Sequence, residues 1–330
     1  MSENLLELAG VGVRLRNGTP LTRDVTLSVG AGEAVGLVGE SGAGKSVTAR
    51  AVIRLLPRGA TVGGGITFDG EPVLAMDRER LRRFRAGQVA MIFQDPRAHI
   101  NPVRKIGDFL TEGLCSTQGV GRAEAVGRVT DLLREVGIDD APRRLRQHPH
   151  ELSGGLLQRV MIAAALAAEP RLLLADEPTT ALDVTTQAEV VKILDRERRT
   201  RGLTMIFVTH DLELAAGLCD RIVVMYAGSV VEDRAAAALA AEALHPYTTG
   251  LLASRPNPRR RMARLPAIPG RPLSAAEAAA EAGCPFAARC PHTEERCLSE
   301  RPELRPLDGG LVACHYAEQL RGAPESVTRR

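Results

Sequence analysis

The sequence has no tryptophan, and only 3% of its 330 residues are aromatic. The core of the fold must therefore be packed mainly from Leu, Val, Ile and Ala. Long apolar runs are also missing, because the longest lies near residues 161–168, whereas a membrane-spanning helix needs roughly 18 residues. The N-terminal residues show no basic segment followed by an apolar stretch, so we expect no signal peptide. We therefore expect a soluble protein whose role at a membrane depends on partners.

The sequence has little net charge and very little lysine. The formal net charge is +3, and lysine occurs only at Lys45, Lys105 and Lys192. So small a charge gives no indication of nucleic-acid binding. The hydrophobic fraction of 44% and the charged fraction of 25% are ordinary for a globular protein. The length suits one large domain with an appendage, or two domains.

Short apolar runs alternate with helical patterns over the first 230 or so residues, which indicates an α/β fold with a largely parallel sheet. Ligands bind at the carboxyl ends of the strands in such sheets. The stretch between about 107 and 169 has only helical patterns, clearest at 122–136 and 156–168, and predicts an inserted helical subdomain. Four runs predict buried strands: 34–38, 89–93, 171–175 and 204–208.

The composition changes after residue 252, and we place the domain boundary there, between 1–252 and 253–330. Pro and Arg dominate residues 254–272, where no helix or strand period is found, so this segment is predicted to be a linker. Its run Arg259–Arg261 is expected to be solvated, with binding to anionic lipid as an alternative. A small cysteine-bearing segment follows at 284–315. Without a secretory signal, its cysteines are expected to be thiols or metal ligands.

A phosphate-binding motif follows the first predicted strand. The stretch GESGAGKS fits G-x-x-x-x-G-K-[ST] and opens a helical pattern that runs to Pro57. Glycines let backbone amides curl around phosphates, and the helix N-terminus adds its positive dipole. Lys45 is expected to reach the β- and γ-phosphates, and the Ser46 hydroxyl to bind Mg²⁺. The predicted nucleotide-binding residues are Gly39, Glu40, Ser41, Gly42, Ala43, Gly44, Lys45, Ser46 and Val47, together with Asp176.

Polar residues end three other predicted strands. Asp176 and Glu177 close the run RLLLADEP, so the first acid is expected to hold Mg²⁺ and the second to deprotonate the attacking water. His210 follows a strand and can donate a hydrogen bond to the γ-phosphate. Gln94 follows another strand and can bind Mg²⁺ or touch the attacking water. Each of these residues taken alone is more often an ordinary polar residue at a strand end, and the functional assignment depends on the whole set.

The set occurs in a characteristic order: GESGAGKS, IFQDP, ELSGGLLQR, LLLADEPTTALD and FVTHD. In this it resembles the nucleotide-binding subunits of ABC transporters over about 250 residues. The resemblance implies a P-loop NTPase fold with a RecA-like core, antiparallel β and helical subdomains, and a head-to-tail dimer enclosing two ATP molecules. The signature residues Ser153, Gly154, Gly155 and Gln158 would act on the partner's ATP. Asp183 would lie in the D-loop at the dimer interface.

The sequence departs from the family pattern at two positions. Leu156 stands where the generic signature has Gln, which we interpret as a trait of the peptide-importer branch, while Gln158 and Arg159 match. Leu15 stands where many relatives stack an aromatic ring on adenine, so the manner of adenine binding is left open. Because Glu177 and His210 are both present, we expect an ATPase with a functional site.

The C-terminal segments HPYTTGLL, RLPAIPGRP and GCPFAARCPHTEERC resemble the C-terminal extension of oligopeptide and dipeptide importer ATPases. Four thiolates suit an iron–sulfur cluster or Zn²⁺, although the short C-x2-4-C spacing of structural zinc sites is absent. The resemblance implies a [4Fe–4S] cluster in some members, with zinc or unliganded thiols as alternatives. His292 and His315 are expected to be surface residues, with a role as substitute ligands as the alternative. The four cysteines of this segment are Cys284, Cys290, Cys297 and Cys314, whereas Cys115 and Cys219 are expected to be core or near-surface thiols.

The resemblance therefore implies an ATP-hydrolysing subunit that energises the import of di- or oligopeptides from the cytoplasmic face of the inner membrane. Its expected partners are a second, different ATPase chain, two integral-membrane permeases and an extracytoplasmic solute-binding protein, without nucleic acid. An importer of nickel or another small solute is an alternative. More distant alternatives are a soluble ABC ATPase acting on nucleic acid and a regulatory binder that does not hydrolyse ATP.

Overall fold

A computed structural model describes residues 4–180, 182–254 and 267–320 of the chain. The chain divides into two compact units that are interleaved in sequence. The first unit consists of Met1–Leu5, Val29–Glu33 and Phe68–Val208, and the second of Leu6–Ser28, Ala34–Thr67 and Thr209–Arg330. The arginine run of the predicted linker, Arg259–Arg261, lies outside the described residues. Across the described residues, none of the helices has both the length and the apolar character that crossing a membrane would require.

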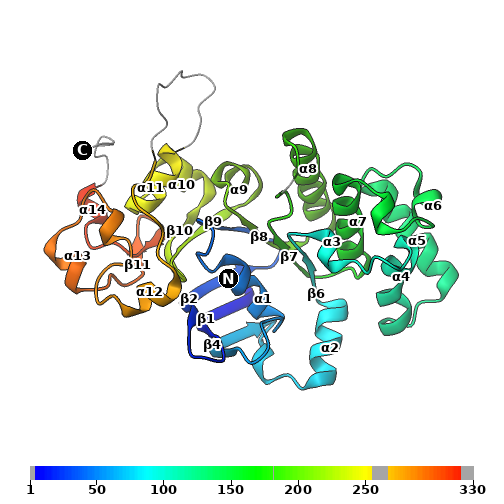
Figure 1. Ribbon diagram of the computed structural model, residues 1–330, viewed down its shortest axis with the longest axis horizontal. Helices are drawn as coiled ribbons and strands as arrows, with labels where there is room; N and C mark the ends of the chain where they lie inside the picture. The colour runs from blue at the N-terminus through cyan, green and yellow to red at the C-terminus, as the bar shows by residue number, and fades with distance from the viewer. Residues whose placement is uncertain (1–3, 181, 255–266, 321–330) are drawn as a thin grey trace. The chain divides into compact units, whose positions relative to one another are not determined.

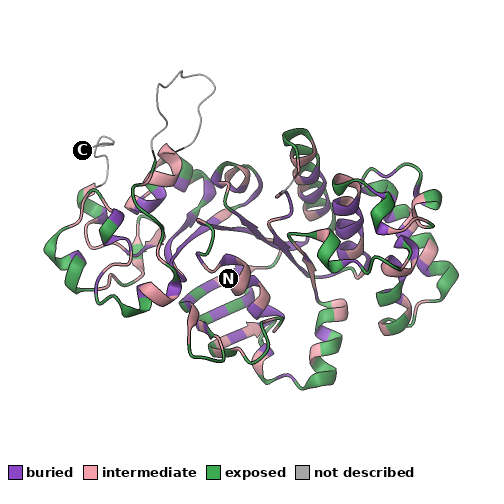
Figure 2. Cartoon of the chain, in the orientation of Figure 1, coloured by how far each residue is buried: buried purple, intermediate pink, exposed green. Residues whose placement is uncertain are grey.

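The first unit contains three parallel strands, β6 (Val89–Ile92), β7 (Leu172–Asp176) and β8 (Thr204–Thr209). Every residue of β7 and β8 is buried, and Figure 2 shows these strands in purple. Parallel strands covered on both faces have continuous apolar runs rather than alternating ones, which is why the sequence identifies them. The predicted strands at 89–93, 171–175 and 204–208 are confirmed with shifts of one residue at their ends.

The segment predicted to be helical, at about 107–169, contains the helices α4 to α7 of the first unit, whose bounds are given below (Figure 1, shades of green). Helices α4, α5 and α7 contact one another. In α5 the buried residues Ala125, Val129, Leu132 and Leu133 fall on one face at the spacing of an amphipathic helix. The helices are α2 (Arg78–Gly87), α3 (Pro96–His99), α4 (Ile106–Thr117), α5 (Arg122–Glu135), α6 (Ala141–Arg144), α7 (Gly154–Ala167) and α8 (Val184–Arg201), with short 3-10 turns Val73–Ala75 and Pro149–Glu151 and the short strand β5 (Glu71–Pro72).

The second unit contains one sheet with the order β2-β1-β4 and a second with the order β11-β12-β10-β9-β3. In the second sheet β3, which matches the predicted strand 34–38, is parallel to β9, a strand that the sequence analysis did not predict, while β10, β12 and β11 add antiparallel pairs. Residues 15–19 join β1 to β2 as a hairpin. The strands are β1 (Asn4–Arg14), β2 (Pro20–Gly30), β3 (Ala34–Val38), β4 (Thr61–Phe68), β9 (Arg221–Tyr226), β10 (Ser229–Ala235), β11 (Arg305–Leu307) and β12 (Gly310–Val312).

The helix that follows the phosphate-binding motif, α1 (Lys45–Val52), ends earlier than the sequence predicts. Arg54 adopts a left-handed conformation with φ of 52°, and the Leu55 amide donates to the Arg50 carbonyl oxygen at 2.9 Å. This pattern closes a helix with a Schellman motif. The prediction that the helix continues to Pro57 is therefore wrong, because backbone capping at Arg54 stops it first.

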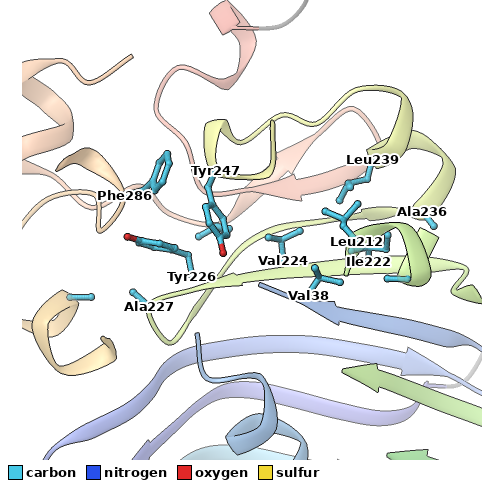
Figure 3. Close-up of a cluster of buried hydrophobic side chains, with 13 residues drawn as sticks. Val38, Leu212, Ile222, Val224, Tyr226, Ala227, Ala236, Leu239, Tyr247 and Phe286 are labelled. Carbon is cyan, nitrogen blue, oxygen red and sulfur yellow. The ribbon is translucent and has the colours of Figure 1, made fainter. Parts of the chain in front are cut away.

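The cysteine-bearing segment, residues 284–315, is built into the second unit, and we call it the cysteine module. Its strand β12 pairs with β10, with Glu232 opposite Val312. Aromatic rings from β9, α11 and the module, namely Tyr226, Tyr247 and Phe286, pack in one buried cluster (Figure 3). The remaining helices of the unit are α9 (Leu212–Leu218), α10 (Ala236–Ala241), α11 (Pro246–Ala253), α12 (Ala275–Ala280), α13 (Glu295–Ser299) and α14 (Ala317–Leu320), with a 3-10 turn at Ala287–Arg289.

Candidate nucleotide-binding site

The phosphate loop, residues 39–46, connects the buried strand β3 to helix α1 in the second unit. Gly39 has φ of 156°, and a Cβ at this position would lie 2.2 Å from the backbone oxygen of Met225. Gly44 precedes α1 with φ of 98°, and its Cβ would lie 2.9 Å from Thr22 Cγ2. Both positions therefore require glycine, and the motif's glycines have a steric reason in this fold.

Lys45, the motif lysine, is only 4% exposed. Its Nζ donates to the carbonyl oxygens of Gly39 at 2.8 Å and Glu40 at 3.0 Å. The ammonium group thus lies across the start of the loop and holds it closed. A buried cation at a helix N-terminus provides the positive charge that a phosphate group needs.

Gln94 and Glu177 lie together in the first unit. Gln94 Nε2 donates to Glu177 Oε2 at 3.0 Å, and the Thr180 hydroxyl donates to the same oxygen at 2.9 Å. Because β6 and β7 are parallel neighbours, their carboxyl ends bring these residues to one edge of the sheet. Asp176, the last residue of β7, is fully buried.

Glu177 adopts an uncommon backbone conformation for a residue with a side chain. Its φ is +46°, and its amide donates to the Val208 carbonyl oxygen at 3.0 Å. Left-handed conformations cost free energy in non-glycine residues and concentrate at functional sites. The turn aims the Glu177 side chain toward Gln94 instead of continuing the strand, and the sequence alone does not predict this.

The signature segment forms the start of helix α7. The Ser153 side chain caps the helix by accepting a hydrogen bond from the Leu156 amide at 3.3 Å. Ser153 and Gly154 are exposed, whereas Gln158 is only 2% exposed and its Nε2 has no hydrogen-bond partner within the described residues. Replacement of the generic Gln by Leu156 leaves the cap intact, because the contact uses only the backbone amide.

The signature lies beside the first turn of helix α8. Asp183 caps α8 by accepting hydrogen bonds from the Thr186 amide at 3.0 Å and the Thr186 hydroxyl at 2.8 Å. These bonds, the backbone one foremost, lower the pKa of the Asp183 carboxyl below its usual value. A Cβ on Gly155 would lie 3.0 Å from Thr186 Cγ2, so the signature glycine packs closely on this turn.

The remaining predicted residues are placed as follows. His210 is exposed at the end of β8 and belongs to the second unit, with the phosphate loop. Gln94, Asp176, Glu177, the signature and Asp183 belong to the first unit. Leu15 is half-buried in the hairpin turn between β1 and β2. Ser46 and Val47 lie half-buried in the first turn of α1, and Ser41 and Gly42 are exposed in the loop.

The four cysteines of the module line one cavity. All four are free thiols, and Phe286, Ala287, His292, Tyr316 and Leu320 are among the other lining residues. Burial raises the pKa of Cys284, Cys290 and Cys314 to about 11, with a smaller contribution from neighbouring cysteines. No group of three or more His, Cys, Asp or Glu side chains that could hold a metal ion is found among the described residues. Cys115 lies half-buried in α4, and Cys219 is buried at the end of α9.

One contact of the phosphate loop has no counterpart in the sequence analysis. The guanidinium of Arg289 pairs with the Glu40 carboxylate at 2.7 Å, across 249 residues. The Tyr247 hydroxyl accepts a hydrogen bond from the Glu40 amide at 2.8 Å. Tyr247 lies in HPYTTGLL, which the sequence analysis associates with the extension, but nothing in the sequence pairs it or Arg289 with the loop.

Comparison with known proteins identifies two matching families. The family model described as "ABC transporter" matches residues 22–180, and the model described as "Oligopeptide/dipeptide transporter, C-terminal region" matches residues 231–297. The chain is 45% identical over 300 residues to the probable peptide ABC transporter ATP-binding protein y4tR of Sinorhizobium fredii, which covers 90% of this chain and 89% of that protein. It is 42% identical over 291 residues to the oligopeptide transport ATP-binding protein OppD of Salmonella typhimurium, with coverage of 88% and 86%.

Solved structures give the same fold. The chain matches cbiO1 of Clostridium perfringens, part of an ABC transporter complex, with a TM-score of 0.63 and 27% identity over 72% of this chain and 91% of that one. It also matches the ATP-binding cassette MJ0796, in a dimeric post-hydrolysis state bound to ADP and phosphate, with the same TM-score and identity over 70% and 98%. The motifs, the fold and these relatives agree, and the chain belongs to the ABC transporter ATP-binding proteins, a family of ATPases.

Proposed function

We propose that this chain hydrolyses ATP to energise the import of di- or oligopeptides through partner permeases. The support is the match of residues 231–297 to the oligopeptide and dipeptide transporter C-terminal region, together with relatives named for peptide transport. The match covers the part of the chain that the ATPase motifs do not explain. The match therefore supports the assignment of the transported substrate, whereas the motifs support the ATPase activity.

The residue roles in this proposal are those that the sequence motifs imply. The amides of residues 39–46 and the Lys45 ammonium bind the phosphates, and Ser46, Gln94 and Asp176 would hold Mg²⁺, which neutralises phosphate charge. Glu177, held between Gln94 and Thr180, accepts a proton from the attacking water. His210 would donate a hydrogen bond to the γ-phosphate.

The signature would act on the ATP of a second cassette. Ser153 and Gly154 are exposed and Gly155 is half-buried at the start of a 14-residue helix, and the amides of a helix N-terminus bind anions. Gln158 is assigned to the same function in the sequence analysis, but its burial places the amide inside the unit, where it would support the signature rather than touch a nucleotide. Asp183 would line the interface between the two cassettes.

The assembly that we propose has three kinds of partner. They are a second, different ATPase chain, which makes the cassette pair a heterodimer, two integral-membrane permeases and an extracytoplasmic solute-binding protein. The chain would lie peripherally at the cytoplasmic face of the inner membrane. Within it, residues 1–252 would form the motor with its helical subdomain at about 107–169, and 253–330 the extension.

We propose that the cysteine module holds a [4Fe–4S] cluster, with a zinc ion or unliganded thiols as the alternatives. Four sulfur donors and several apolar side chains line one cavity, yet no three potential ligands among the described residues converge on one ion site. Each cysteine of a cubane binds a different iron, so the sulfurs need not converge. Cys284, Cys290, Cys297 and Cys314 would hold the cluster, which would supply a rigid cross-link between distant parts of the module.

The proposed substrate is tested by uptake into cells. Deleting the chain should abolish accumulation of labelled di- and oligopeptides, and the parent chain should restore it, while nickel accumulation stays unchanged. Restoration by a Lys45→Ala chain, or a loss confined to nickel, would contradict the proposal. The matched control is Lys192→Ala, which removes an exposed lysine of α8 outside all of the motifs.

The proposed cluster is tested by absorbance. The chain purified without oxygen should be brown, with a broad band near about 400 nm, as iron–sulfur clusters show. Cys290→Ser should remove the band, whereas Cys115→Ser, in helix α4, should keep it. A colourless parent chain, or one that contains zinc in place of iron, would exclude the cluster.

A further inference from the structure

Arg289 of the cysteine module forms an ion pair with Glu40, the second residue of the phosphate loop. Its Nη1 lies 2.7 Å from Glu40 Oε2 and its Nη2 lies 3.0 Å from Glu40 Oε1. This is the two-pronged arginine–carboxylate geometry, which fixes orientation as well as charge. Arg289 is only 5% exposed, whereas the Glu40 side chain is 26% exposed, so the arginine side of the pair is shielded from water and salt. Both residues belong to the second unit.

The Arg289 side chain is itself held firmly. Its Nε donates to the Pro269 carbonyl oxygen at 2.8 Å. Its guanidinium carbon lies 5.7 Å from the ring centre of Tyr226 and 5.8 Å from that of Phe286, which is within the range of cation–π attraction. Figure 3 shows these two rings together with Tyr247. The arginine is therefore positioned before any nucleotide binds.

Glu40 has all of its polar groups engaged at once. Its amide donates to the Tyr247 hydroxyl at 2.8 Å, and its carbonyl oxygen accepts from Lys45 Nζ at 3.0 Å. Its two carboxylate oxygens accept from Arg289. The second residue of the phosphate loop is thus fixed from three sides, two of which come from chain segments beyond residue 245.

The negative charge of Glu40 is unfavourable for the binding of phosphate by this loop. A loop that binds phosphates gathers amides and a lysine because the ligand is an anion. A carboxylate in that loop repels the ligand unless a nearby cation neutralises it. Arg289 provides this cation, and its two contacts leave the carboxylate oxygens directed at the module rather than at a ligand.

We propose that Arg289 is a positioning residue of the phosphate loop: by neutralising and fixing Glu40 it sets the affinity of the loop for ATP. This inference rests on the assignment of the loop as the nucleotide site. Arg289 closes a 3-10 turn between Cys284 and Cys290, with the Cys290 amide donating to the Ala287 carbonyl oxygen at 3.2 Å. The cysteine module thereby becomes part of the ATP site's support and not only a separate appendage.

The test compares four versions of the chain in the assembled transporter: parent, Arg289→Gln, Glu40→Gln and the double variant. Arg289→Gln should raise the KM for MgATP about tenfold, because an unpaired carboxylate then faces the ligand. Its kcat should stay within about threefold, because Glu177 and Gln94 are untouched. The double variant should return KM to within about threefold of the parent, because no carboxylate remains to repel the ATP. Equilibrium binding of a fluorescent ATP analogue should follow the same order.

A merely structural role predicts a different pattern. In that case the double variant would be no better than Arg289→Gln, or kcat would fall while KM stayed constant, and either result would overturn the inference. Arg301→Gln is the matched control, since it removes a half-buried arginine of the same module that bonds to the Ala278 carbonyl oxygen. Its KM should equal that of the parent.

A second variant keeps the test decisive where Arg289→Gln does not fold. Arg289→Lys retains the charge but loses the two-pronged geometry, so KM should rise about threefold. A KM for this variant equal to the parent value would overturn the inference. A parent complex that binds no ATP would instead contradict the proposed function, so the two failures are distinguishable.

Discussion

Replacing Glu177 by Gln should lower ATP turnover in the assembled transporter by about 10²–10⁴-fold, the range expected when a general base is lost. Gln has nearly the same shape as Glu, and its side-chain oxygen can still accept the hydrogen bond from Thr180 that holds Glu177 in place. It cannot accept a proton from water, however. ATP binding should therefore persist while hydrolysis nearly stops, so that the variant accumulates with ATP bound.

The measurement is phosphate release by the assembled complex, with bound ATP determined in parallel. Glu124→Gln is the matched control, because Glu124 is exposed on α5 and forms a surface ion pair with Arg128 one turn away. Such surface pairs contribute less than about 1 kcal/mol to stability, so turnover should remain close to that of the parent. Turnover at the parent rate in Glu177→Gln would remove Glu177 from the proposed role.

Gly39→Ala should damage both stability and nucleotide binding. The new Cβ would lie 2.2 Å from the Met225 carbonyl oxygen, and the φ of 156° is strained for any residue with a side chain. Met225 lies in β9, which is paired with β3 on one side and β10 on the other, so β9 cannot easily retreat. The loop must move instead. We expect a loss of about 2–4 kcal/mol in the free energy of unfolding, and ATP binding weakened at least about tenfold.

Thermal unfolding and binding of a fluorescent ATP analogue measure these two effects. Gly18→Ala is the control, since Gly18 also has a positive φ, 83°, but no atom lies within 4 Å of its added Cβ. It lies in the β1–β2 hairpin, so the cost should be only the backbone strain of about 1 kcal/mol. Equal losses of stability in the two variants would show that the contact with Met225 is not what requires glycine at position 39.

The sequence predicts the parts of the fold and site that depend on interactions between residues close together in the chain. The buried strands appear as continuous apolar runs, and the phosphate loop as glycines followed by Lys45. Ser153 and Asp183 cap their helices as short polar residues do. That Gln94 and Glu177 lie near each other could also be inferred from the sequence, because parallel strands end at a common edge of the sheet. The hydrogen bond between them could not.

Features that depend on distant partners could not be predicted. The pairing of Arg289 with Glu40 joins residues 249 positions apart, and no motif or residue spacing in the sequence indicates it. The burial of Gln158 depends on how α7 packs against α4 and α5, and the left-handed φ of Glu177 depends on its bond to Val208. The end of α1 at Val52 was missed because capping at Arg54 uses only backbone groups, which any residue supplies.

The pairing of β12 with β10 has a consequence for synthesis of the protein. An unpaired strand edge invites association with other chains, and β10 keeps such an edge until residues 310–312 become available. Those residues leave the ribosome well after β10, so a chain that is truncated or stalled between the two strands exposes the unpaired edge of β10. In the folded protein the strand at this edge of the sheet is β11, which is only three residues long. Its central residue is Pro306, and proline has no amide hydrogen that could pair with a strand of another chain.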